Sequence, residues 1–182
     1  MTQFAHLVDN GPRCRDALSQ GQHVEAVLVT GLERYLEWTY RDGGLQDKPY
    51  WELIVICSAK AGESASSVVN RASQRMRQVG RQWRERLQQE GDRVQGSAAP
   101  VVPTIFAFVI KYSVVSVLSY DACSAQKPIR TLAQLNHLLD GFDVWHAFTV
   151  GIICVYTRDR LMGMEAQGIF GTLLQSVEDV DA

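Results

Sequence analysis

The chain has 182 residues, of which 46% are hydrophobic and 21% are charged, and its formal net charge is −2. This composition excludes collagen-like, coiled-coil-only and disordered chains, and it predicts roughly one globular domain. The balance of 18 basic against 20 acidic residues also excludes a long-range field that would gather nucleic acid or an anionic membrane. Any such binding has to be local.

The four cysteines are widely separated in the sequence: Cys14, Cys57, Cys123 and Cys154. Because no C-x-x-C pair and no cysteine near a histidine doublet is present, we expect free thiols and no metal. No P-loop or Rossmann fingerprint occurs either, and we expect no cofactor. Residues 1–15 lack the apolar stretch of a signal peptide, which predicts an intracellular protein of the cytoplasm or nucleus. The longest apolar run, Val144–Tyr156, has thirteen residues, which is too few to cross a bilayer, and it is expected to be a buried core element.

The first third of the chain predicts a lead-in, a helix and a strand. Residues 1–21 are expected to form a loose lead-in with one short helix, because glycine, proline and charged residues interrupt them. From His23 to Arg41 apolar residues recur at helical spacing, and Asp42-Gly43-Gly44 ends the predicted helix. The run Tyr50–Cys57 is rich in β-branched and aromatic residues, which predicts a central strand covered on both faces.

The middle third predicts a long helix and a pair of strands. Ser64 is placed to cap a helix that extends to about Glu90, with an apolar stripe on one face and mostly arginines on the others. Two antiparallel strands are predicted at residues 105–110 and 114–120, with the turn between them.

The last third predicts one further helix. Leucines recur at helical spacing after Pro128, so we expect a helix that runs to about Tyr156 with a kink at Gly141. The whole pattern predicts an α/β (α+β) protein with a small central sheet flanked by helices. We place its single domain at residues 22–161 and a C-terminal tail at 162–182.

A set of scattered residues between positions 50 and 160 carries a family resemblance: Ile54-Val55-Ile56-Cys57-Ser58-Ala59-Lys60, Gly62-Glu63, Gln74, Gln82-Trp83, Val101-Val102-Pro103 and Trp145. With the order helix, strand, helix, strand, strand, helix, this set resembles the PD-(D/E)XK nuclease-like domains of fungal proteins. The resemblance implies a restriction-endonuclease-like core that lacks part of the usual sheet. It also marks Ser58, Gln74 and Trp145 as candidate substrate-binding residues.

The departure from that family is at the metal site. Nucleases of this fold hold a divalent cation with a glutamate two residues before the lysine, and here that position is Ser58, before Lys60. A neutral hydroxyl is a weak ligand for a hard cation. Glu52 lies roughly 20 Å away by strand rise and cannot replace the missing acid. We therefore expect a degenerate relative, a pseudo-nuclease that acts in binding or assembly rather than in phosphodiester cleavage.

The first alternative is a metal-independent enzyme of the isomerase, cyclase or lyase type, acting on a small molecule in an apolar pocket. Asp143 and His146 are spaced i, i+3 on the predicted late helix and can form an acid–base pair, with the carboxylate raising the pKa of the imidazole. His137 and Asp140 have the same spacing. The other candidates for proton transfer or anion binding are Asp121, at a strand end, and Lys60. The ordinary structural explanations are that Asp121 is a turn residue and that Lys60 extends into solvent.

The second alternative is non-catalytic binding of nucleic acid through the arginine-rich helix. Arg75 and Arg81 are the candidate phosphate contacts, although a solvated helix exterior is the ordinary explanation of such a face. We expect the partner to be an unidentified small molecule or protein, with a second copy of the chain among the candidates. Nucleic acid is not favoured, and no membrane partner is expected.

Overall fold

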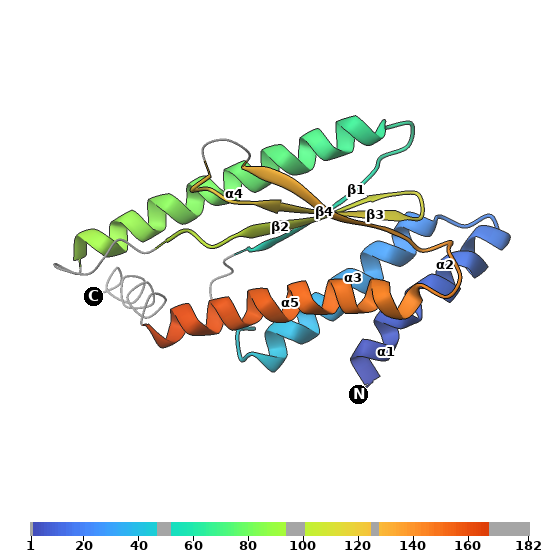
Figure 1. The fold of residues 1–182 in the computed structure, drawn as a ribbon, viewed down its shortest axis with the longest axis horizontal. Coiled ribbons are helices and arrows are strands. Elements are labelled where there is room, and N and C mark those ends of the chain that lie inside the picture. Colours follow the sequence, from blue (N-terminus) through green and yellow to red (C-terminus); the bar gives the residue numbers. More distant parts are fainter. Residues whose placement is uncertain (1, 47–51, 94–100, 125–127, 168–182) are drawn as a thin grey trace, which may run out of the picture.

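The computed structural model describes residues 2–46, 52–93, 101–124 and 128–167, which form a three-layer arrangement around one sheet (Figure 1). The strands are β1 (Ile54–Ser58), β2 (Ile105–Lys111), β3 (Val114–Tyr120) and β4 (Ile129–Asn136). They lie side by side in the order β1-β2-β3-β4, with β1 parallel to β2 and the other neighbours antiparallel. The predicted α/β class, a small sheet flanked by helices, is confirmed.

Helices cover both faces of this sheet. One face is covered by α4 (Ala65–Arg93), and the other by α1 (Thr2–Val8), α2 (Asn10–Ser19), α3 (Val24–Asp42) and α5 (Asp143–Ala166) (Figure 1). Alternate strand residues enter the two cores: Val55 and Ala107 pack under α4, whereas Ile54 and Phe108 pack against α3 and α5. Strands that are buried on both faces have nearly continuous apolar sequences, as β1 and β2 do here.

The long helix forms as its sequence predicts. The Ser67 backbone N–H donates to Oγ of Ser64 at 3.1 Å, which caps the start of α4. Its apolar stripe is buried: Val68, Ala72, Met76, Val79, Trp83 and Leu87. Nε1 of Trp83 donates to the carbonyl oxygen of Glu52 at 3.1 Å and ties the helix to the start of β1. The predicted antiparallel pair of β2 and β3 is also confirmed.

The first strand differs from the prediction in its place. The sequence predicts a central strand for the run ending at Cys57, but β1 lies at one edge of the described sheet, where β2 is its only neighbour among the described strands. Its sequence is apolar because α4 and α3 cover its two faces, not because strands flank it on both sides. Of the predicted run Tyr50–Cys57, residues 50 and 51 lie outside the described residues.

The prediction of one helix from Pro128 to Tyr156 is wrong in its first half. Residues Ile129–Asn136 form β4, and α5 begins only at Asp143. A β-bulge explains the misleading spacing: Val117 pairs with Ala133 and Leu118 with Thr131, so Leu132 is an extra residue in the strand. Gly141 has a φ of +82° in the turn before α5, so it permits a left-handed turn instead of kinking a helix.

The amino-terminal segment is more ordered than predicted. Two helices, α1 and α2, replace the expected loose lead-in with one short helix. Leu7, Cys14 and Ala17 are buried in the core shared with α3 and α5. Pro12 does not interrupt α2, because it lies in the first turn, where no intrahelical donor is lost. Within the described ranges no helix is long and apolar enough to span a bilayer.

Candidate functional site

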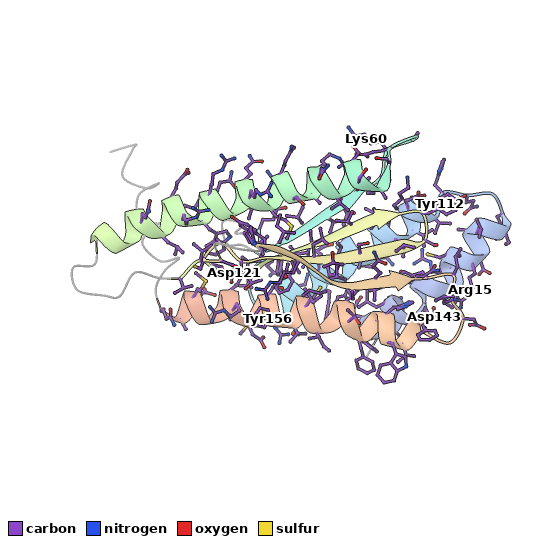
Figure 2. The ribbon with its side chains drawn as sticks, turned by 45° about the horizontal axis from the view of Figure 1, so that its top comes forward. Arg15, Lys60, Tyr112, Asp121, Asp143 and Tyr156 are labelled. Atoms are coloured by element: carbon purple, nitrogen blue, oxygen red, sulfur yellow. The ribbon has the colours of Figure 1, made fainter. Side chains whose placement is uncertain are left out.

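Three strands have their carboxyl ends on the same side of the sheet. Because β1, β2 and β4 run in one direction, Ser58, Lys111 and Asn136 lie together at these ends, and we call this side, across the strand ends, the carboxyl edge. Since β3 runs the other way, Asp121 lies at the opposite edge, roughly 20 Å away by strand rise (Figure 2). Oδ1 of Asp121 accepts the backbone N–H of Cys123 at 2.9 Å, which is a turn contact. The structure therefore does not bring Asp121 together with the other predicted catalytic residues.

A pocket of about 800 Å³ opens at the β1 and β2 end of the carboxyl edge. We call it the carboxyl-edge pocket. The α2–α3 connection, the loop after β1 and the β2–β3 turn surround it. Apolar side chains such as Leu18, Val24 and Val29 form one wall, and Lys60 and Lys111 belong to the other. Lys60 is exposed there, so of the predicted residues Ser58 and Lys60 do share a site. Ligands of open α/β sheets commonly bind at this edge.

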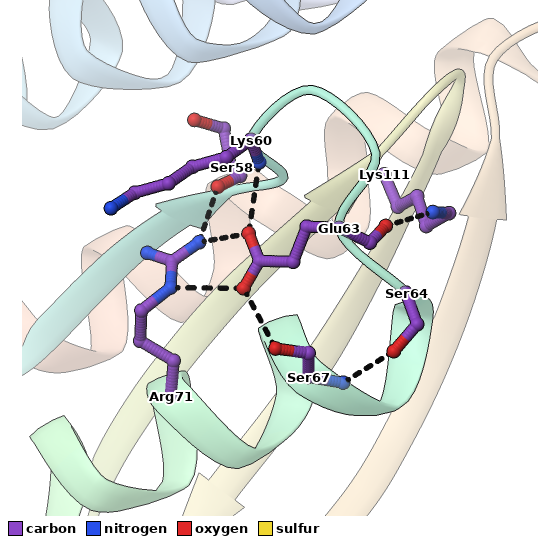
Figure 3. A network of polar contacts seen from close by, with 7 residues as sticks. All are labelled: Ser58, Lys60, Glu63, Ser64, Ser67, Arg71 and Lys111. Carbon is purple, nitrogen blue, oxygen red and sulfur yellow. Dashed lines mark hydrogen bonds and ion pairs between the residues drawn. The ribbon is translucent and has the colours of Figure 1, made fainter.

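The loop between β1 and α4 is held by one carboxylate (Figure 3). Oε2 of Glu63 accepts Nη2 of Arg71 at 2.9 Å and the backbone N–H of Lys60 at 2.8 Å, and Oε1 accepts Oγ of Ser67 at 3.1 Å. The same Nη2 of Arg71 donates to the carbonyl oxygen of Ser58 at 2.7 Å. The Arg71 guanidinium, with these further donors, lowers the pKa of Glu63 to about 2. Glu63 is therefore an ionised clamp for the loop.

The second cluster at the carboxyl edge surrounds Asp143, at the start of α5. Its carboxylate accepts both terminal nitrogens of Arg15, from α2, at 3.1 and 2.8 Å (Figure 2). Nη2 of Arg15 also lies 3.3 Å from the carboxylate of Asp140, and Nη1 donates to the carbonyl oxygen of His137 at 3.3 Å. Arg15 thus joins α2, the end of β4 and α5 in one bidentate contact.

The two histidines of this cluster are packed against each other. His137 and His146 are both buried, with ring centroids 4.9 Å apart, and neither Nδ1 has a hydrogen-bond partner among the described residues. Burial lowers the pKa of His137 to about 4, with the neighbouring His146 adding to the effect. Burial also lowers the pKa of His146, although the Asp143 charge acts in the opposite direction.

These contacts correct the predicted acid–base pair. Asp143 and His146 do share the first turn of α5, but the Asp143 carboxylate is bonded to Arg15 and the pKa of His146 falls instead of rising. His137 and Asp140 are not a helical pair, because His137 follows β4 and Asp140 lies in a turn.

The other predicted binding residues do not converge. Gln74, Arg75 and Arg81 are exposed on α4, whereas Trp145 is exposed on α5 beyond the opposite face of the sheet. Nη2 of Arg75 forms an ion pair with Oε2 of Glu52 at 2.7 Å. With Arg71 also paired, the cationic face of α4 is partly neutralised by the protein itself.

The outer side of α5 is apolar, and the prediction of a fully buried run from Val144 to Tyr156 is wrong for this side. Four side chains line up along it with helical spacing: Trp145, Phe148, Ile152 and Tyr156. Trp145 is 66% exposed and Ile152 is 67% exposed. Exposed Leu139, Phe142 and Val144 extend the surface at its amino-terminal end. We call these seven residues the exposed α5 face.

The sequence interpretation missed Arg15 and most of the exposed α5 face. Arg15 carried no signal beyond its spacing of four residues from Gly11, which places the two on one face of a helix. The α5 surface did have a signal, since no charged residue occurs between Asp143 and Arg158. A helix packed by one side only should carry charges on the other.

No group of three or more His, Cys, Asp and Glu side chains within the described ranges could hold a metal ion. No protein family, no curated protein and no solved structure matches this chain.

Proposed function

We propose that this protein is a non-catalytic binding module that assembles with another protein surface through the exposed α5 face. The supporting observation is the large exposure of Trp145 and Ile152 in one contiguous apolar stripe. Soluble monomers rarely expose contiguous apolar patches of more than a few hundred Å² unless the patch binds something. Aromatic anchors of this kind dominate the binding energy of protein interfaces.

The contacts of the candidate catalytic groups favour binding over chemistry. The Asp143 carboxylate is neutralised by Arg15, the His146 ring is buried against His137, and Lys60 belongs to a separate pocket. An acid–base enzyme needs such groups within reach of one substrate. The proposal includes the degenerate PD-(D/E)XK-like origin: Ser58 stands in place of the acid, and the Arg71 guanidinium already occupies both oxygens of the nearby Glu63.

A protein partner suits the exposed α5 face better than a lipid surface. Helices that lie on anionic membranes carry lysine and arginine beside their apolar stripe. Between Val144 and Thr157 this helix has no charged residue; exposed Asp140 lies near one end, and exposed Asp159 and Arg160 lie near the other. An apolar stripe without cations along its length lacks the charge attraction that holds a helix on an anionic membrane, and it suits a protein interface.

Site-specific photocrosslinking tests this function. A photoreactive benzoylphenylalanine in place of Ile152 of the full chain is expected to form a covalent adduct with a protein in the cells that make it. The same group at Gln78, exposed on α4, is the matched control and should form none. An absence of adducts at position 152 above the level of position 78 would contradict the proposal.

A second candidate function, binding of a small organic acid, is favoured by the carboxyl-edge pocket. Its volume of about 800 Å³ suits a small molecule, and its lining combines apolar side chains with the exposed Lys60. We expect octanoate to shift the NMR signals of residues 58–63, and Lys60→Gln to weaken its binding by about tenfold through loss of a charge-assisted hydrogen bond. Arg81→Gln, exposed on α4 and outside the pocket lining, should leave the affinity unchanged. Equal affinity in the Lys60 variant would remove this candidate.

A further inference from the structure

We propose that the partner of the exposed α5 face is a second copy of this chain, with the two α5 helices packed antiparallel across a two-fold axis near Val150. The inference rests on the proposed function, because it names the occupant of the same surface. Closed two-fold dimers are the commonest oligomers, and they require a patch that is complementary to itself.

The four central side chains have this property. Trp145 and Tyr156 lie at nearly equal distances on either side of position 150, and Phe148 and Ile152 lie at equal distances inside them. In an antiparallel pair centred there, Trp145 would meet the partner's Tyr156 and Phe148 would meet the partner's Ile152. Each contact sets an aromatic ring against a ring or a branched aliphatic side chain, and the first is one of the aromatic pairings that stabilise interfaces.

The exposed apolar area is of the size that a dimer needs. From their exposed fractions, the seven residues of the exposed α5 face leave on the order of 700 Å² of side chain in solvent, close to the ~800 Å² that each partner buries in a standard interface. The segment from Trp145 to Tyr156, about three turns of helix, supplies most of it, so a facing helix can cover it without rearrangement of the fold. A small-molecule ligand could not cover such an extended stripe.

The charges at the two ends select the antiparallel orientation. Asp140, in the turn before α5, and Arg160 lie ten residues to either side of position 150, and both residues are exposed. Asp159, beside Arg160, is already paired with Arg158 at 2.9 Å. An antiparallel pair brings Arg160 near the partner's Asp140 at both ends, whereas a parallel pair sets like charges together. Arg160 has no ion pair that would compete among the described residues, and the Asp140 carboxylate is 90% exposed although it lies 3.3 Å from Arg15.

Sedimentation velocity and light scattering on the full chain test the dimer. We expect a dimer at about 100 µM, dissociating on dilution with a micromolar Kd. Ile152→Glu places two carboxylates at the centre of the interface and should give a monomer with unchanged circular dichroism, because Ile152 is 67% exposed in the single chain. Gln78→Glu adds the same charge on α4 and should remain dimeric.

A charge exchange tests the orientation. Asp140→Arg and Arg160→Asp should each weaken the dimer by about tenfold, since each affects two symmetric contacts, and the double variant should recover most of the loss. Single variants without effect, or a double variant weaker than either, would overturn the antiparallel arrangement.

The outcome separates this inference from the proposed function. A chain that stays monomeric at about 100 µM, while the photoreactive group at position 152 captures a different protein, overturns self-association and leaves the binding function standing. A monomer without any adduct overturns both. An adduct with the mass of two chains, lost in Arg160→Asp, supports both.

Discussion

Replacing Gly11 with alanine is expected to lower the free energy of unfolding by about 3 kcal/mol, the upper part of the usual range for overpacking. A Cβ at Gly11 would lie 1.7 Å from Oδ1 of Asp143 and 2.4 Å from its Cγ. The carboxylate cannot simply withdraw, because Arg15 holds both of its oxygens. Relief of the clash therefore costs either the ion pair or the packing of α2 on α5. Urea unfolding followed by circular dichroism measures the loss.

The matched control is Gly163→Ala, also in a helix interior. A Cβ there meets no atom of the described residues within 4 Å, so the variant should gain up to about 1 kcal/mol from helix propensity. If Gly11→Ala were as stable as this control, the carboxylate of Asp143 would not lie against Gly11, and the described packing of α2 on α5 would be contradicted.

The elements that the sequence predicts well are those with complete local signals. Ser64 caps α4, and the apolar stripe from Val68 to Leu87 fits one helical face over several turns. The strands β2 and β3 are short, rich in β-branched residues and joined by a tight turn at Tyr112 and Ser113. In both cases the residues that determine the structure are neighbours in the sequence, so periodicity alone identifies them.

The elements that the sequence predicts poorly depend on distant partners. Residues Ile129–Asn136 have a leucine spacing that a helix would also satisfy, but the open edge of β3 offers a full ladder of hydrogen bonds, and the bulge at Leu132 absorbs the mismatch. The two amino-terminal helices are short, and short helices are stable mainly through packing, here against α3 and α5. The local sequence pattern of these segments gives no sign of the strand or helices against which they pack.

The candidate site shows the same division. Ser58 and Lys60 are close in the sequence and share the carboxyl-edge pocket, as expected for two residues at the end of one strand. The partner of Asp143 is Arg15, which lies 128 positions earlier. Local spacing suggested only the pairing with His146, so Arg15 could not be identified as the competing partner. A salt bridge between elements depends on tertiary packing that spacing does not encode.

The buried histidine pair is expected to make the protein unstable in mild acid. The folded-state pKa of His137 is about 4, whereas the ordinary value is 6.5, so only the unfolded chain takes up a proton between these values. Stability is then complete above pH 6.5 and is lost as pH falls toward 4, by about 3 kcal/mol in total and about 2 kcal/mol between pH 6.5 and 4.5. His146 acts in the same direction, Asp143 opposes the loss, and the Arg15 charge adds to it.

Urea unfolding of the full chain at about pH 7.5, 6.5, 5.5 and 4.5 measures this slope. His137→Phe keeps an aromatic ring against His146 but has no proton to bind, so most of the loss attributable to His137 should disappear even if the variant is less stable overall. His23→Gln, at an exposed histidine before α3, should keep the full slope. The Glu63 carboxylate contributes little above pH 4.5, because its stabilisation is lost only as pH falls from its ordinary pKa of 4.5 toward its folded pKa of about 2. Equal slopes in the His137 variant and the unmodified chain would mean that the packed ring does not exclude the proton, and that the joint between β4 and α5 is open to water.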